Sequence, residues 1–152
     1  MPKPSHLLAT PDDVENAFYE GLQHANIEQV MACWADDEDL VCIPPGGEPV
    51  HGLQAITRMF TDLLANGPIG VRAMHTHKTQ SMAHAIHTVT EHVSVMTDDG
   101  EAIAQLYALN VFHKTPQGWR LVAHHTSPGH LTEMPSQPLS GGGLGTGSSA
   151  LH

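Results

Sequence analysis

The chain has 152 residues, 40% of them hydrophobic, which fits one globular domain and excludes a disordered chain. Sixteen acidic residues against six basic ones give a formal net charge of −10, so we expect neither nucleic acid nor a membrane surface as a partner. Two cysteines, Cys33 and Cys42, are too few for a disulfide framework. The sequence has no signal-peptide layout and no apolar run of about 20 residues, so we expect a cytoplasmic protein.

Three helices are predicted in the first half of the chain. Thr10 is a suitable N-cap for a helix that begins at Pro11, and apolar side chains then recur every three or four residues. These side chains are Val14, Phe18, Leu22 and Ala25. Asn26 opens a second helix, with Gln29 placed to complete a capping box. A third helix with a wide apolar face follows Gly52.

Strands dominate the second half of the chain. A short buried strand over residues 40–43 comes first, and longer β-rich stretches cover residues 70–81, 84–97, 101–114 and 119–127. Hairpin turns are expected at residues 98–100 and 115–118, and a third near residues 81–83. Helices followed by such a meander predict an α+β fold with the helices on one face of the sheet. We divide the chain into an N-terminal extension (1–9), one domain (10–130) and a flexible Gly/Ser-rich tail (131–152).

Both faces of the predicted sheet carry apolar side chains. Val93, Ile103 and Leu109 lie on one face, and Leu106, Phe112 and Leu121 lie on the other. Three helices can cover only one face, so the outer face needs another partner. We predict a homodimer that forms through this outer sheet face.

Two segments resemble motifs of the nuclear transport factor 2-like superfamily, which is also called cystatin-like or ketosteroid-isomerase-like. One runs over residues 26–52 and ends in PPGGEPVHG, and the other, residues 118–128, reads GWRLVAHHTSP, similar to the end of many SnoaL-like members. The resemblance covers residues 10–130. It implies a cystatin-like cone, with three N-terminal helices packed on a strongly curved antiparallel sheet that encloses a pocket. Members include isomerases, dehydratases, polyketide cyclases and a kinase oligomerisation domain, so the fold does not decide the function.

The residues of ketosteroid isomerase transfer poorly onto this chain. The resemblance places the carboxylate base at Ile43, which cannot accept a proton, and the tyrosine donor at Phe18, which lacks a hydroxyl. Tyr19 is adjacent but is expected to point elsewhere on the helix. The second donor falls at Asn110, which can still donate a hydrogen bond. We therefore do not expect steroid-type isomerisation.

Strand alternation predicts which side chains line the pocket. If Asn110 faces it, the same face holds Leu106, Ala108, Phe112, Trp119, Leu121, Ala123, His125 and Ser127. A three-residue turn at 98–100 adds Thr88, Thr90, His92 and Ser94, and the helices add Phe18, Leu22, Trp34 and Phe60. This assignment requires strands without a β-bulge, because one bulge exchanges the two faces beyond it. We predict His125 or His92 as a general base and Asn110 as the group that polarises a carbonyl oxygen; alternatively, the histidines only hydrogen-bond within the sheet.

The opposite face is predicted to be rich in histidine. Its polar members are His75, His77, His87, Glu91, Gln105, Tyr107, Arg120 and His124. Histidine and glutamate on one face can ligate a divalent metal, but the sequence has no HExxH or comparable spacing. We therefore interpret these residues as a polar dimer interface, which could respond to pH, and we assign no metal ligand. No phosphate-binding or dinucleotide motif is present, so we expect no cofactor.

The sequence thus predicts a protein that binds a small hydrophobic organic ligand in a cone-shaped pocket. If it is an enzyme, cofactor-free acid–base chemistry of the cyclase or dehydratase kind is expected. The alternative is a non-catalytic homo-oligomerisation module whose pocket is vestigial.

Overall fold

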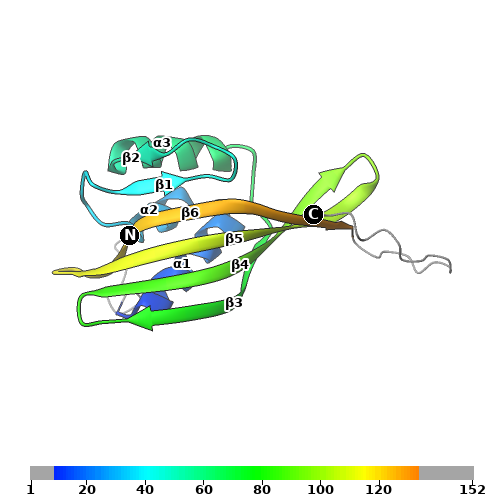
Figure 1. The fold of residues 1–152 in the computed structure, drawn as a ribbon. Coiled ribbons are helices and arrows are strands. Elements are labelled where there is room, and N and C mark those ends of the chain that lie inside the picture. The colour runs from blue at the N-terminus through cyan, green and yellow to red at the C-terminus, as the bar shows by residue number, and fades with distance from the viewer. Residues whose placement is uncertain (1–8, 134–152) are drawn as a thin grey trace.

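The computed structural model describes residues 9–133, in which three helices pack on one face of a six-stranded sheet (Figure 1). In chain order the elements are α1 (Pro11–Gln23), α2 (Ile27–Ala32), β1 (Val41–Ile43), β2 (Val50–His51), α3 (Leu53–Leu64), β3 (Val71–Gln80), β4 (His84–Thr97), β5 (Gly100–Thr115) and β6 (Gly118–Glu133). The sheet order is β2-β1-β6-β5-β4-β3, and the predicted α+β fold is confirmed. Between residues 9 and 133, no helix has the length and apolar character that a bilayer span requires.

The predicted terminal segments fall mostly outside the described residues. Nearly all of the predicted N-terminal extension, and the predicted tail from residue 134 onward, lie outside the described residues. Strand β6 continues to Glu133, three residues beyond the predicted end of the domain at residue 130.

Local sequence signals set the starts of α1 and α2. The Thr10 hydroxyl oxygen accepts a hydrogen bond from the Asp13 N–H at 3.1 Å, and the Asn26 side-chain oxygen accepts one from the Gln29 N–H at 3.1 Å. The Gln29 side chain does not complete a capping box; it donates to the Ala17 carbonyl at 2.9 Å and so ties α2 to α1.

The turn between β4 and β5 decides which β4 side chains face the helices. Thr97 pairs directly with Gly100, so the turn contains only Asp98 and Asp99 and not the three residues that we expected. Odd-numbered residues of β4 therefore share a face with even-numbered residues of β5, as the pairing of His87 with Asn110 illustrates. The predicted orientation of every β4 side chain is reversed as a result.

Two bulges in β6 change the orientation of the last strand. Phe112 pairs with Leu121 but Val111 pairs with Ala123, so Val122 is an additional residue in β6. Residue 129 is a second additional residue, and it is glycine because a Cβ there would collide with the Gln105 carbonyl oxygen. The side chains of β6 between Val122 and Gly129 consequently face opposite to the predicted direction.

The hydrophobic core lies between α1 and the concave face of the sheet, with Phe18 at its centre. The Phe18 ring makes edge-on contacts with Phe60 at 5.8 Å and with the His124 imidazole at 5.0 Å between centroids. Strand β1 pairs in parallel with β6, so the sheet is antiparallel except at this pairing. This pairing places the buried Cys42 beside His124.

Candidate functional site

Seven polar side chains are buried on the concave face of the sheet and on the facing side of α1. The interior cluster, as we call it, contains Glu15 and Tyr19 of α1, His87 and Glu91 of β4, Asn110 of β5, and His124 and Thr126 of β6. Each of these residues is at most 6% exposed. Buried polar groups need partners, so their contacts define what the cluster can do.

Asn110 lies at the centre of the interior cluster. Its side-chain NH₂ donates to Glu15 Oε2 at 2.9 Å and to the Tyr19 hydroxyl at 3.2 Å, and its Oδ1 contacts His124 Nδ1 at 2.5 Å. Because an amide oxygen only accepts, His124 Nδ1 carries the proton. The other nitrogen, Nε2, then accepts from the Thr126 hydroxyl at 3.0 Å. These contacts suit a neutral imidazole.

The electrostatics of the cluster agree with this protonation state. Burial, together with a smaller contribution from the nearby His125, lowers the pKa of His124 to about 4. Burial raises the pKa of the Cys42 thiol to about 12, with the Glu91 charge acting in the same direction. His124 is therefore neutral and Cys42 is a thiol at neutral pH.

Glu91 is the buried carboxyl group of the cluster that is best placed to exchange a proton. The Tyr19 hydroxyl donates to Glu91 Oε2 at 2.7 Å, and His124 Nε2 lies 3.9 Å from the same oxygen. Burial raises the pKa of Glu91, the Tyr19 hydrogen bond opposes this, and the Glu15 charge adds to it. Burial also raises the pKa of Tyr19 well above its ordinary value, so this hydroxyl remains a donor.

A surface depression at the edge of the sheet reaches Tyr19. It has a volume of about 370 Å³ and is lined by Asn16, Tyr19, Glu20, Gln23, Arg72 and Ala73. Ala73 of β3 pairs with Glu91 of β4, which places the Glu91 backbone next to this depression. A small molecule held between α1 and β3 would therefore meet Tyr19 first.

The predicted pocket residues fall into two groups. The first group lies in the hydrophobic core. Its members come from the helices, from β5 and from the start of β6: Phe18, Leu22, Trp34, Phe60, Ala108, Phe112 and Trp119. Asn110 lies in the interior cluster, as its orientation predicted. The remaining residues, Thr88, Thr90, His92, Ala123, His125 and Ser127, lie on the outer face, because of the two-residue turn and the Val122 bulge.

Three residues that we predicted on the outer face lie instead on the inner face of the sheet. His87, Glu91 and His124 were predicted at a dimer interface, but each is buried against the helices. Four of the residues predicted for the pocket, Thr88, Thr90, His125 and Ser127, instead line a depression of about 340 Å³ on the outer face, together with Tyr107.

Sequence reasoning missed the contribution of Glu15 and Tyr19. Both face the sheet, although Tyr19 was expected to point elsewhere, because the curved sheet contacts more than one stripe of α1. The spacing of Asp12, Glu15 and Tyr19 is a detectable signal, since residues at i, i+3 and i+7 lie on one side of a helix.

Comparison with known proteins places this architecture in a family. Residues 12–130 match the family model described as SnoaL-like domain. No curated protein matches the chain.

Several solved structures are similar to this one. A candidate calcium/calmodulin-dependent protein kinase type II association domain from Thiobacillus denitrificans is 28% identical, with a TM-score of 0.73 over 83% of this chain and 98% of that one. A candidate dehydratase of the NTF2-like family from Streptomyces avermitilis is 27% identical, with a TM-score of 0.67 over 78% of this chain and 98% of that one. A protein with a cystatin-like fold from Caulobacter vibrioides, 15% identical, has a TM-score of 0.67 over 77% of this chain and 85% of that one, and this likeness concerns the fold alone. The expected superfamily and fold are thereby confirmed.

The buried neutral His124 makes the stability of the fold depend on pH. Between pH 6.5 and about 4 the unfolded chain binds a proton at this histidine that the folded chain does not. The free energy of unfolding should therefore fall as the pH drops through this window, by up to about 3 kcal/mol. Urea denaturation across the window measures this fall, and His124→Gln, which keeps a donor and an acceptor, should make it shallower. His125→Gln, a change at the exposed neighbouring residue, is the matched control and should retain the steep fall. Equal slopes for His124→Gln and the unmodified protein would contradict the assignment.

Proposed function

The chain belongs to the SnoaL-like domain family, and from this premise we propose that it binds a small organic carbonyl compound and moves a proton on it without a cofactor. The observation that carries the proposal is the buried Glu91 carboxyl, held by the Tyr19 hydroxyl at 2.7 Å, where Tyr19 lines a depression of about 370 Å³. Strongly perturbed titratable groups beside a concavity are a physical mark of acid–base sites.

Glu91 acts as the general base in this proposal. Burial raises its pKa, which makes the carboxylate a stronger base than an exposed one. A buried carboxylate also becomes less costly once it has accepted a proton, because desolvation penalises only the charged form. Removal of a proton beside a carbonyl group therefore suits this environment.

Tyr19 and Asn110 have separate roles. Tyr19 lines the depression and its hydroxyl donates to Glu91, so in this proposal the hydroxyl proton turns to the charged substrate oxygen once Glu91 has accepted the substrate proton. Asn110 donates to Tyr19 at 3.2 Å and to Glu15 at 2.9 Å, which makes it a positioning residue. This replaces the role of carbonyl donor that the sequence suggested for Asn110. The candidate dehydratase from Streptomyces avermitilis, at 27% identity, supports the same class of chemistry.

Deuterium exchange into a small ketone tests this proposal. With 2-indanone in D₂O, followed by proton NMR, the protein should accelerate exchange of the α-protons over buffer. Glu91→Gln should lower the rate at least about a hundredfold, and Tyr19→Phe should lower it less. Glu28→Gln is the matched control, because Glu28 is an exposed carboxylate of α2 that belongs neither to the lining of the depression nor to the interior cluster, and it should leave the rate unchanged. An unaltered rate in Glu91→Gln, with circular dichroism showing an intact fold, would refute Glu91 as the base.

A second proposed function, homo-oligomerisation through the outer face of the sheet, rests on a different observation. Ile86, Tyr107 and Leu109 are 43%, 42% and 39% exposed on neighbouring strands of that face. Exposed apolar groups gathered on one sheet face favour a partner, and a second copy of the chain offers the same surface. The 28% identity with a candidate kinase association domain supports this role. A dimer is compatible with acid–base chemistry, because the interior cluster lies on the opposite face.

Light scattering after size-exclusion chromatography tests the dimer. The unmodified chain should have twice the mass of one chain, and Leu109→Arg should have the mass of one chain, because a buried unpaired charge opposes association. Met82→Arg is the control, since Met82 is 92% exposed in the turn between β3 and β4 and lies away from the proposed interface. A monomeric unmodified chain would contradict the proposal.

A further inference from the structure

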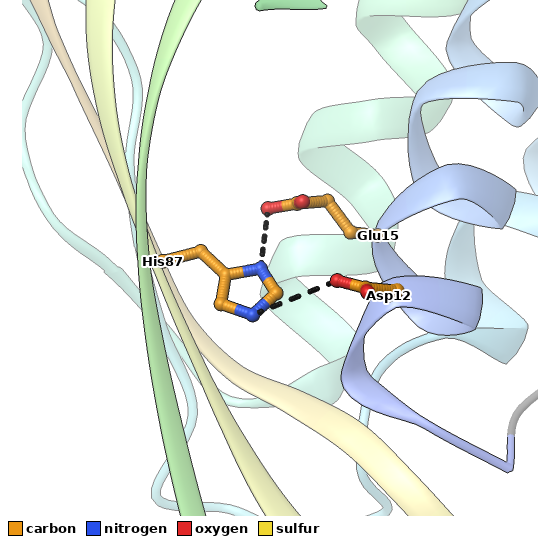
Figure 2. Close-up of side chains that lie close together, drawn as sticks. All are labelled: Asp12, Glu15 and His87. Carbon is orange, nitrogen blue, oxygen red and sulfur yellow. Dashed lines mark ion pairs between the residues drawn. The ribbon is translucent and has the colours of Figure 1, made fainter. Parts of the chain in front are cut away.

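Three side chains meet where the N-terminal part of α1 lies against β4, at the end of the interior cluster away from Glu91. They are Asp12 and Glu15 of α1 and His87 of β4 (Figure 2). One potential ligand atom from each residue lies within 4.8 Å of the others. The proposed proton transfer uses none of these side chains directly.

The imidazole of His87 has an unusual environment. It is 1% exposed, and its Nδ1 has no hydrogen-bond partner among the described residues. Nδ1 lies 3.1 Å from Glu15 Oε2, but an N–H on this nitrogen would not point at that oxygen, so the contact is one of proximity and charge. Burying a nitrogen without a hydrogen bond lowers the stability of the fold. This nitrogen lies beside a carboxylate oxygen at the separation expected for two ligands of one metal ion.

The two carboxylates complete a set of three metal ligands with His87. Asp12 and Glu15 are three residues apart near the N-terminal end of α1, so both side chains lie on the same side of this helix. One imidazole nitrogen with two carboxylate oxygens suits Zn²⁺ and similar divalent transition metals. We propose that Asp12, Glu15 and His87 bind one divalent transition-metal ion, through one oxygen of each carboxylate and Nδ1 of His87.

Of the two carboxylates, only Asp12 must rotate to bind the same metal ion as His87 Nδ1. Asp12 Oδ1 lies 4.0 Å from His87 Nε2, on the other side of the ring, so Asp12 must turn toward Nδ1 (Figure 2). Its side chain is 53% exposed and has room to do so. Glu15 need not move, because Asn110 holds the same oxygen that faces Nδ1.

Lys78 competes with the metal ion for the carboxylate of Asp12. Its ammonium group lies 2.8 Å from Asp12 Oδ1, and its side chain is 47% exposed. The metal must displace this ammonium group from Asp12 or share the carboxylate with it. Loss of the lysine should therefore strengthen metal binding, whereas loss of the Asp12 charge should weaken it.

Calorimetric titration with ZnCl₂ tests the proposal on the full chain, purified without a histidine tag and freed of metal with a chelator. The unmodified chain should bind zinc at this site, Asp12→Asn should weaken binding at least about tenfold, and Lys78→Ala should strengthen it. Both changes are at half-exposed side chains, so the variants should fold. The matched control is His84→Gln, because the exposed His84 and the half-buried His113 have ring centroids 4.6 Å apart and could bind zinc adventitiously.

The outcomes separate the alternatives. Opposite shifts in Asp12→Asn and Lys78→Ala, with unchanged binding in His84→Gln, support the site. Loss of binding in His84→Gln, or equal affinities in all variants, overturns it. Absence of zinc binding in the unmodified chain also overturns it. These measurements use no ketone substrate, so their failure is independent of the proposed proton transfer.

Discussion

One side-chain amide joins α1 to the two central strands of the sheet. Asn110 of β5 bonds to Glu15 and Tyr19 of α1 and to His124 of β6, at 2.9, 3.2 and 2.5 Å. Every polar atom of this amide is engaged, so the buried group is satisfied and its rotation is fixed. It thereby sets the proton position on His124 and the direction of the Tyr19 hydroxyl. The helix could pack on the sheet through Phe18 alone, but hydrophobic contact would not specify these orientations.

The charges of the interior cluster are arranged at a cost to stability. Burial raises the pKa of Glu91, and the ionised form of this group is therefore destabilised in the folded protein at neutral pH. His124 is held neutral and supplies no compensating charge. A well-packed apolar side chain would avoid this cost. A carboxyl group buried at this cost, and bonded to a tyrosine that lines a surface depression, is the basis of the proposed acid–base role.

Local features of the fold followed from the sequence, and long-range register did not. The caps at Thr10 and Asn26, the starts of the helices and the positions of the hairpins depend on a few adjacent residues, and they were predicted correctly. The face on which a strand residue lies depends on the number of residues in a turn and on bulges. A two-residue turn at Asp98 and the additional residue Val122 each reversed one strand, so His125 was predicted in the pocket while the interior position belongs to His124. Tyr19 was missed because the apolar stripe of α1 marks only part of its buried surface. The curved sheet also covers the neighbouring side of the helix, where Tyr19 lies.

The central claim is that Glu91 is a buried base whose proton affinity is set by burial and by Tyr19. NMR titration of the ¹³C-labelled Glu91 carboxyl measures this most directly. The account predicts a midpoint above the ordinary value of 4.5, and a still higher midpoint in Tyr19→Phe, because the tyrosine hydrogen bond stabilises the carboxylate. A midpoint at or below 4.5, or no change in Tyr19→Phe, would contradict it.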